Sequence, residues 1–591
     1  MKRTYSLICL MILSIAFLPS AFITPANSSH ETPVYGGRVI VARYEDTMTI
    51  NPILAPGITS LETTGLIFDG LMRLDTQGLP KPALATAYTV SSDGKTYTFN
   101  LLRNVTFHDG VNFTAADVKF TFDQAVFNKS VSFIYRSYYQ PLESVIAVDD
   151  YTVEFHLKNA SGPFISWMNL PILPKHIYNA GGNPDLNKDP HNFNPIGTGP
   201  FKFHEYVKDD HLTLKAYENC WHGRPYLDEV VFRVIPDPGT MAIALERGEI
   251  DFARDISFSD TVRLALDSSA GKNNITVLIG PPNYIIGVRA CFQSSYFNKT
   301  NPNSLKIRQA IGYAIDREGI SRSVYYGLAT TAHSPLPTAY PFWNNEIMAS
   351  GSFTYNATKA NEILDEIYPK GSDGFRFELE LAGATADRDY LELVKVQLER
   401  VGIKIHLSVT EKSAYWAHIL GPYELGTWTW VAVPDPGWVQ NSWASWTTSA
   451  YTIAAFGRAN DTGSYLSSGP ATEIDTLLMQ AEVETNATRR QELYYRFQEI
   501  VGFEDPAPIF TNFKPWPHAY RNDLRGIEPV SMMLYETCLS NSLAHVWRVP
   551  TASTGTQEPF PTTLVVATAA VIAAIVIATF IILKRKGTKK I

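Results

Sequence analysis

Several short segments of the chain alternate between apolar and polar residues, the pattern typical of half-buried β-strands. Residues 95–101 (KTYTFNL) and 151–157 (YTVEFHL) follow this pattern. Residues 36–42 (GGRVIVA) instead form a nearly continuous apolar run, which predicts a buried strand. The folded body is therefore expected to begin near residue 36.

Helical spacing of apolar residues occurs between such strands. It predicts one helix over 115–127, with Thr114 as its N-cap, and another over 389–401. Gly402 ends the second helix and is followed at once by an apolar strand at 403–409. Because a helix, a glycine and a strand in succession are typical of α/β layers, we predict an α/β fold.

Both ends of the chain carry apolar segments that predict export and anchoring. Two basic residues precede an apolar run over 7–18, and small residues follow it, so 1–26 is predicted to be a secretory signal peptide. Residues 564–583 lack charge, proline and glycine, and this length is enough to cross a hydrocarbon core of about 30 Å. The basic residues in 584–591 place that tail in the cytoplasm and the preceding chain outside the cell.

The part of the chain between these ends is expected to be an acidic extracellular body. Residues 550–563 are rich in Pro, Thr and Ser and are predicted to form a short stalk. The whole chain has a net charge of −8 at pH 7, and the predicted signal and anchor contribute basic residues only. The body is therefore more acidic than the whole chain, which argues against nucleic acid as a partner.

Few residues suggest chemistry. Only Cys220, Cys291 and Cys538 follow the predicted signal, and three cysteines allow at most one disulfide within the chain. The sequence contains no G-x-S-x-G, H-E-x-x-H, C-x-x-C or Walker A motif. His204, His211 and His222 are spaced too irregularly to suggest a metal site. We therefore predict that the protein is not an enzyme and uses neither metal nor cofactor.

Seven ordered blocks of sequence carry a family likeness. They are 81–87 (KPALATA), 93–103 (DGKTYTFNLLR), 107–110 (FHDG), 113–118 (FTAADV), 171–176 (PILPKH), 197–201 (GTGPF) and 308–317, which begins RQA and ends AIDR. In this order they resemble the peptide- and nickel-type (family 5) extracellular solute-binding proteins of ABC transporters. A C-terminal membrane helix in place of a lipid anchor is similar to archaeal members. Most of these blocks supply turns and caps, so they indicate the family without marking the site.

The resemblance implies a two-lobed, periplasmic-binding-protein-like (type II) clam with an extra domain on the first lobe and one C-terminal transmembrane helix. The first lobe would comprise 30–60, 190–284 and 506–549, the extra domain 61–189 and the second lobe 285–505. The chain would cross between the lobes near 284–289 and 509–513, and closure around a ligand would be a hinge motion. The implied partners are a small-molecule or short peptide ligand and the permease subunits, with the ATPase on a separate chain.

The most informative segment for ligand binding is 427–446 (TWTWVAVPDPGWVQNSWASW), which holds five of the eleven tryptophans. Members of the family carry a similar segment that ends in Asp-Pro and lines the cleft, and Asp435 here precedes a proline. The aromatic area suits a ligand site with a polar rim, although each tryptophan taken singly fits a place in the core equally well. The candidate residues from this segment are Trp428, Trp430, Asp435, Trp438 and Trp443.

One departure from the family leaves the ligand open. Peptide receptors commonly place an aspartate a few residues before the Asp-Pro, where it pairs with the α-ammonium group of the peptide, but 431–433 (VAV) offer no carboxylate. Asp435 is the candidate replacement, since a buried ammonium group requires a partner. Gly57 and Ile58 are expected to offer backbone groups.

Two ligand classes therefore remain. The first is dipeptides or oligopeptides, and the alternative is oligosaccharides whose apolar faces stack on the tryptophans. A surface adhesion or sensory protein built on the same fold is a third class. The cytoplasmic tail is too short to hold a signalling domain, which favours delivery of the ligand to a permease.

Overall fold

The computed structural model describes residues 32–55, 57–75, 79–182, 185–298, 300–338, 340, 344, 353–419, 422–431, 435–444, 470–506, 508–527 and 543–549. The predicted signal peptide, stalk, transmembrane helix and tail lie outside these residues, as does Cys538. Within the described ranges, no helix is both long and apolar enough to cross a membrane. Cys220 and Cys291 are both buried, and the predicted limit of one disulfide stays a prediction.

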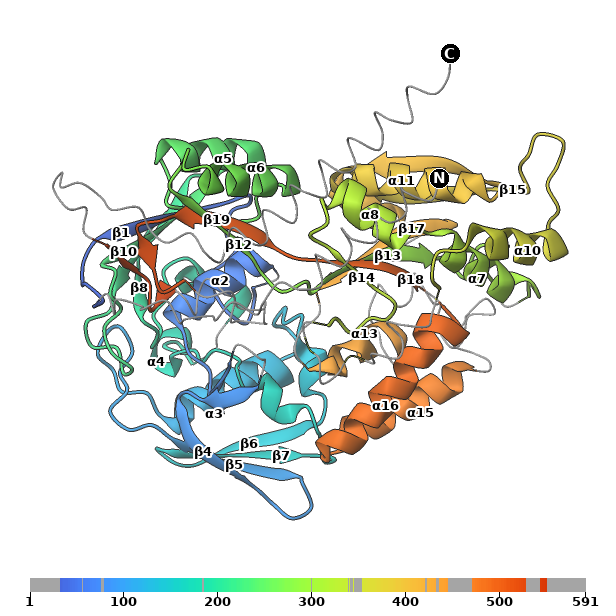
Figure 1. Cartoon of the computed structure of the whole chain (residues 1–591). Coiled ribbons are helices and arrows are strands. Elements are labelled where there is room, and N and C mark those ends of the chain that lie inside the picture. The colour runs from blue at the N-terminus through green and yellow to red at the C-terminus, as the bar shows by residue number, and fades with distance from the viewer. Residues whose placement is uncertain are drawn as a thin grey trace, which may run out of the picture.

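The first sheet has seven strands in the order β12-β19-β11-β1-β10-β9-β8 and forms the left half of the molecule in Figure 1. Its central strand β1 runs parallel to β10 and β11. Val39 and Val41 of β1 face a core shared with helix α2, while Ala42 faces the core under helices α5 and α6. Burial on both faces explains the apolar run of the sequence. These elements are β1 (Arg38–Arg43), α2 (Ile58–Ile67), β8 (Phe201–Val207), β9 (His211–Ala216), β10 (Glu229–Val234), α5 (Pro238–Arg247), β11 (Phe252–Ala253), α6 (Phe258–Ser269), β12 (Ile275–Ile279) and β19 (Pro517–Arg521).

The second sheet has six strands in the order β14-β18-β13-β17-β15-β16 and lies on the right in Figure 1. The helix and strand predicted around Gly402 are α11 and β16, and Gly402 has a φ of +85° between them, a conformation that favours glycine. The elements are β13 (Tyr284–Ala290), α7 (Ser304–Ala314), α8 (Arg317–Val324), β14 (Thr330–Thr331), α10 (Ala357–Ile367), β15 (Phe377–Ala384), α11 (Arg388–Arg400), β16 (Ile403–Thr410), α12 (Lys412–His418), β17 (Leu425–Val431), α13 (Gln440–Trp443), α15 (Pro470–Val483), α16 (Ala487–Glu499) and β18 (Pro508–Lys514).

A third, four-stranded antiparallel sheet in the order β4-β5-β7-β6 forms the lower part of the molecule in Figure 1. Helix α3 packs on it and begins with the predicted cap, where Thr114 and Asp117 form a reciprocal capping box. The predicted helix over 115–127 continues past α3 as a π-helical turn over Asp123–Phe127. The elements are β4 (Ala85–Val90), β5 (Thr96–Leu101), α3 (Ala115–Phe122), β6 (Leu142–Asp149) and β7 (Thr152–Leu157), with β2 (Met72–Leu74), β3 (Pro80–Pro82), α4 (Lys175–Tyr178), β20 (Leu524–Arg525) and β21 (Trp547–Arg548) outside this sheet.

The chain passes between the two large sheets twice, at 280–283 after β12 and at 515–516 after β18. In Figure 1, β18 and β19 form one extended red path that joins the two halves. The crossings expected at 284–289 and 509–513 are instead paired strands, because β13 and β18 form a ladder with each other. A change of sheet requires residues that are released from such a ladder, so the connections fall just outside it.

Candidate functional site

The first sheet presents a set of polar residues beyond the carboxyl ends of its parallel strands. Ligands of open α/β sheets bind beyond such ends. Arg43, the last residue of β1, donates a hydrogen bond to the carbonyl oxygen of Thr59 in the first turn of α2, at 2.7 Å. This contact places the start of α2 at the same edge. Arg254 and Asp255 follow β11 directly.

Gly57 and Ile58, two of the predicted site residues, lie at this edge. Gly57 is the N-cap of α2, and Ile58 is its first residue. Both are partly exposed. The first turn is tied to the loop after β1, since the amide of Met48 donates to Oγ of Ser60 at 3.1 Å. The expectation that Gly57 and Ile58 offer backbone groups to a ligand stays a proposal.

The second sheet brings a corresponding set of residues to the hinge. Register pairs Tyr284 of β13 with Val431 of β17 on one side and with Lys514 of β18 on the other. Nζ of Lys514 lies 4.4 Å from the centroid of the Tyr284 ring and 3.9 Å from Oδ1 of Asp387. Burial raises the pKa of the Asp387 carboxyl, and the charge of Lys514 opposes that effect.

The two edges meet at the hinge. The amide of Ile256 donates to the carbonyl oxygen of Pro517 at 3.1 Å, which fixes the end of β11 beside the start of β19. The ring of Phe258, in the first lobe, lies 5.2 Å from that of Tyr325 in the second. Both carboxyl edges therefore border the segments that connect the two large sheets.

The candidate tryptophans divide into buried and accessible ones. Trp428, Trp438 and Trp443 belong to the core of the second lobe, with at most 6% of their surface exposed. Trp443 makes edge contacts with Trp428 and with Phe497, at centroid distances of 5.7 Å and 5.6 Å. Trp430 is partly exposed and stacks on Trp438, with ring centroids 5.7 Å apart and an interplanar angle of 11°. Trp430 is thus the tryptophan among these four with surface to offer to a ligand.

Asp435 is engaged inside the protein. Nη1 and Nη2 of Arg490, on helix α16, each donate a hydrogen bond of 2.8 Å to its carboxylate. The amide of Gly437 donates to the same group at 2.8 Å. This differs from the expectation that Asp435 replaces the missing ammonium partner, because a carboxylate paired with a guanidinium in a buried site is already neutralised.

No sequence pattern pointed to Asp255, whose carboxylate lies at the edge of the first sheet in unusual surroundings. Both of its carboxylate oxygens are screened from solvent and accept no hydrogen bond. Burial, reinforced by the charges of Glu62 and Glu45 and opposed by that of Arg254, raises the pKa of the Asp255 carboxyl to about 6. A lone acidic residue after a strand carries no recognisable pattern, so only the folded chain could reveal it.

The part of the chain that carries the four-stranded sheet also contacts helix α15, away from the connections at 280–283 and 515–516. The amide of Gly162 donates to the carbonyl oxygen of Glu482 at 2.8 Å, and Oγ of Ser161 donates to the carboxylate of the same residue at 3.0 Å. Figure 1 shows the α15–α16 hairpin reaching the end of the small sheet at this point. The two lobes are therefore in contact on both sides of the region between their carboxyl edges.

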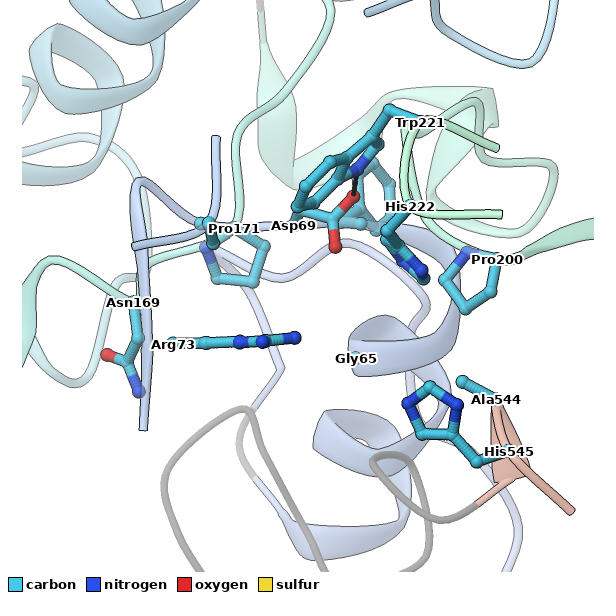
Figure 2. A pocket seen from close by; sticks show the side chains of 13 residues that line it. Gly65, Asp69, Arg73, Asn169, Pro171, Pro200, Trp221, His222, Ala544 and His545 are labelled. Carbon is cyan, nitrogen blue, oxygen red and sulfur yellow. Dashed lines mark hydrogen bonds between the residues drawn. The ribbon is translucent and has the colours of Figure 1, made fainter. Parts of the chain in front are cut away.

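A separate pocket lies at the other end of α2, within the first half of the molecule. Figure 2 shows Arg73, His222 and His545 around it, with Asp69 hydrogen-bonded to Trp221 at its rim. The carboxylate of Asp69 accepts from Nε1 of Trp221 at 2.9 Å and from the hydroxyl of Thr198 at 2.8 Å, so it is satisfied within the protein. Because the length of α2 separates this pocket from Gly57, it does not form part of the interlobe site.

Among the described residues there is no group of three or more His, Cys, Asp or Glu side chains placed to hold a metal ion. Of the three histidines considered from sequence, His211 lies beside Asp210 and Glu205, which raise the pKa of its imidazole against the effect of burial. These contacts are those of a surface ion pair.

Comparison with known proteins places these features in context. Residues 80–451, more than half of the chain, match the model of the bacterial extracellular solute-binding proteins, family 5. The oligopeptide-binding protein AppA of Bacillus subtilis is 29% identical over 447 residues, which cover 70% of this chain and 78% of that protein. The dipeptide-binding protein of Escherichia coli is 27% identical over 491 residues, which cover 77% and 85%.

Solved structures agree with these matches. The periplasmic binding protein DppA from Helicobacter pylori, solved in complex with the peptide STSA, has a TM-score of 0.71 and 26% identity, and the match covers 87% of this chain and 98% of that one. The similarity confirms the predicted α/β, periplasmic-binding-protein-like fold.

Proposed function

The chain belongs to family 5 of the bacterial extracellular solute-binding proteins, and from that premise we propose that it is the substrate receptor of an ABC importer that captures dipeptides or oligopeptides. The two relatives and the solved structure described above bind, by their names, oligopeptides, dipeptides or the peptide STSA. These names favour peptides over the oligosaccharide alternative. Because the family consists of binding proteins, we propose no enzyme activity for this chain.

The arrangement of the two carboxyl edges around the hinge carries the proposal. Residues from both lobes border the same two connections, so a ligand held between them contacts both lobes and stabilises the closed state. On the second lobe we propose Trp430 as the aromatic contact, supported from behind by Trp438. On the first lobe, Gly57 and Ile58 are the proposed source of backbone contacts.

The remaining parts of the prediction concern placement in the cell. We propose that 1–26 direct export, that 550–563 form a stalk and that 564–583 anchor the protein in the membrane with the binding lobes outside. The permease subunits would receive the ligand, and a separate chain would supply ATP hydrolysis. Removal of 564–591 is expected to release the protein from membranes, as cell fractionation would measure.

Thermal unfolding of the purified full-length protein in detergent tests the ligand class. A ligand that binds the folded state alone raises the unfolding midpoint as its concentration rises. At a ligand concentration 100 times its Kd, the free energy of unfolding increases by about 2.7 kcal/mol. Panels of short peptides and of oligosaccharides are titrated separately. A shift with peptides supports the proposal, a shift with sugars alone replaces peptides by the alternative ligand class, and no shift with either contradicts both.

A further inference from the structure

Asp255 is held in a strained backbone conformation at the carboxyl end of β11. Its φ is +56°, in the left-handed region that residues other than glycine adopt at a cost of about 1 kcal/mol. Two hydrogen bonds hold the segment: the amide of Asp255 donates to Nδ1 of His518 at 3.3 Å, and the next amide donates to Pro517. Strain that the neighbouring structure maintains is a frequent feature of binding sites.

The carboxylate of Asp255 is buried without a hydrogen-bond donor. Neither oxygen has a hydrogen-bond partner, and both are buried, so the 13% of the side-chain surface that remains exposed lies on its carbon atoms. Buried polar groups are nearly always hydrogen-bonded, and an unsatisfied buried charge is costly. The group is therefore placed to accept hydrogen bonds from something that is not part of this chain.

The nearest cation is committed elsewhere. Nη1 of Arg254 donates to the carboxylate of Glu62 at 2.6 Å, while its Nε lies 3.5 Å from Oδ2 of Asp255. Because Arg254 and Glu62 are both almost fully buried, their charges compensate each other first. Arg254 is therefore shared between the two carboxylates: it is hydrogen-bonded to Glu62 and forms with Asp255 an ion pair without a hydrogen bond.

His518 does not supply a charge either. Its Nδ1 lies 3.8 Å from Oδ1 of Asp255 but accepts the hydrogen bond from the Asp255 amide, so the ring proton is on Nε2. Burial, with a smaller contribution from Arg254, lowers the pKa of the His518 imidazole to about 3. The ring is neutral at physiological pH.

We propose that Asp255 receives a primary ammonium group of the ligand, and so provides from the first lobe the acidic partner that the tryptophan segment of the second lobe lacks. An ammonium group offers three donors, enough for both unsatisfied oxygens of Asp255. In the second-lobe segment, 431–433 (VAV) carry no carboxylate, and the carboxylate of Asp435 is already paired with Arg490. This inference rests on the proposed function, and it narrows the ligand to molecules that carry a free amine.

Calorimetric titration of the full-length protein tests this assignment. The ligands are a tripeptide with a free N-terminus, its N-acetylated form, and an N-acetylated tripeptide that contains lysine. The unmodified protein is expected to bind the free tripeptide at least about 30-fold more tightly than the acetylated one, the ratio for loss of one partner of a buried charge pair. Recovery of affinity with the lysine peptide would mean that the site accepts any primary amine; no recovery would mean that it reads the α-ammonium group. Both results support the assignment.

The variant Asp255→Asn is expected to lose this discrimination and to bind free and acetylated tripeptides alike. Asparagine tolerates the left-handed conformation and keeps the size of the side chain. Asp209→Asn is the matched control, because Asp209 is also left-handed, with a φ of +60°, but is exposed on the same lobe. Retained discrimination in Asp255→Asn, or equal binding of both tripeptides by the unmodified protein, would overturn the assignment while leaving peptide binding intact. Absence of any peptide binding would contradict the proposed function itself.

A second measurement separates a binding role from a structural one. If the Asp255 carboxylate serves to bind a ligand, its removal relieves a buried charge that no hydrogen bond satisfies, so Asp255→Asn is expected to raise the unfolding midpoint of the ligand-free protein at pH 7. Asp209→Asn should leave the midpoint unchanged. A lower midpoint for Asp255→Asn would show that the carboxylate stabilises the fold and would count against the proposal.

Discussion

Asp435 and Arg490 form a two-point ion pair inside the second lobe. The residues stand 55 positions apart in the sequence, and the two hydrogen bonds between them both measure 2.8 Å. Only 7% of the Asp435 side chain and 5% of the Arg490 side chain are exposed. The pair ties the short helical turn at Pro436–Val439 to helix α16.

Breaking this pair is expected to destabilise the protein. In Asp435→Asn the Arg490 charge is left buried without its partner, which lowers the free energy of unfolding by about 3–5 kcal/mol. Urea unfolding measures the loss. The double variant Asp435→Leu/Arg490→Leu should recover a large part of it, since no isolated charge remains. If Asp435→Asn unfolds like the unmodified protein but binds peptide weakly, Asp435 contacts the ligand after all.

The tryptophans are expected to separate stability from binding. Trp443→Ala empties a fully buried site and should lower the free energy of unfolding by about 3–5 kcal/mol. Trp430→Ala removes a partly exposed ring, so it should cost less stability but weaken ligand binding about tenfold or more, as aromatic contacts at binding sites commonly do. Urea unfolding and calorimetric titration measure the two quantities. Equal effects of both variants on both quantities would contradict the division.

The contact between the extra domain and the second lobe is expected to support closure. A Cβ atom at position 162 would lie 2.3 Å from the carbonyl oxygen of Glu484, so Gly162→Ala must push the two apart. The variant should bind ligand more weakly and show a larger radius of gyration in small-angle scattering with ligand present. Gly181→Ala, in the same domain, has open space at that position and is the control. An unchanged radius and affinity in Gly162→Ala would refute this role.

The free energy of unfolding is expected to fall as the pH drops from about 6.5 to about 4. Burial lowers the pKa of His108 and His333 to about 4 and that of His518 to about 3. Between these pH values the unfolded chain therefore binds more protons than the folded chain. The free energy of unfolding consequently rises with pH across this range.

The Asp255 carboxyl acts in the opposite direction, because its pKa of about 6 lets the folded chain bind a proton more readily than the unfolded chain. Burial also raises the pKa of the Asp117, Asp387 and Glu482 carboxyls, which act in the same direction as Asp255. Between pH 7 and pH 5 the three histidines dominate, because their unfolded pKa of about 6.5 lies inside this range whereas that of an unfolded carboxyl lies below it. Urea unfolding at pH 7 and pH 5 measures the change, and His518→Gln should flatten it. A stability that is equal at both pH values would contradict the expectation.

Ligand affinity should also depend on pH if Asp255 binds an ammonium group. The charged and titratable groups around its carboxylate are Tyr44, Glu45, Glu62, Arg254 and His518. Below about pH 6 the carboxyl takes up a proton, so affinity for a free tripeptide should fall, whereas affinity for the acetylated form should not. Titration at pH 7.5 and pH 5.5 distinguishes the two, with Asp255→Asn as the control that lacks the effect.

The sequence by itself determined the local elements and the family. Alternation over 95–101 and 151–157 corresponds to β5 and β7, and the apolar run over 36–42 corresponds to β1. These strands were predictable because the pattern of apolar residues within a strand indicates which of its faces are buried. Thr114 capped its helix as predicted for the same reason, since a capping box involves residues only three apart. The ordered blocks indicated the family, and the comparisons confirmed it.

Only the tertiary structure decided which side chains can meet a ligand. Trp428 and Trp430 are two residues apart on β17 and share a face of the strand. Phe510 and Trp443, from distant parts of the chain, cover Trp428, while Trp430 stays accessible near the end of the strand. Asp435 and Asp255 are equally acidic in the sequence, yet Arg490 neutralises one and nothing in the described chain satisfies the oxygens of the other. Charge compensation depends on residues that folding brings together from remote positions in the sequence. Their spacing along the chain therefore does not predict which charges are paired.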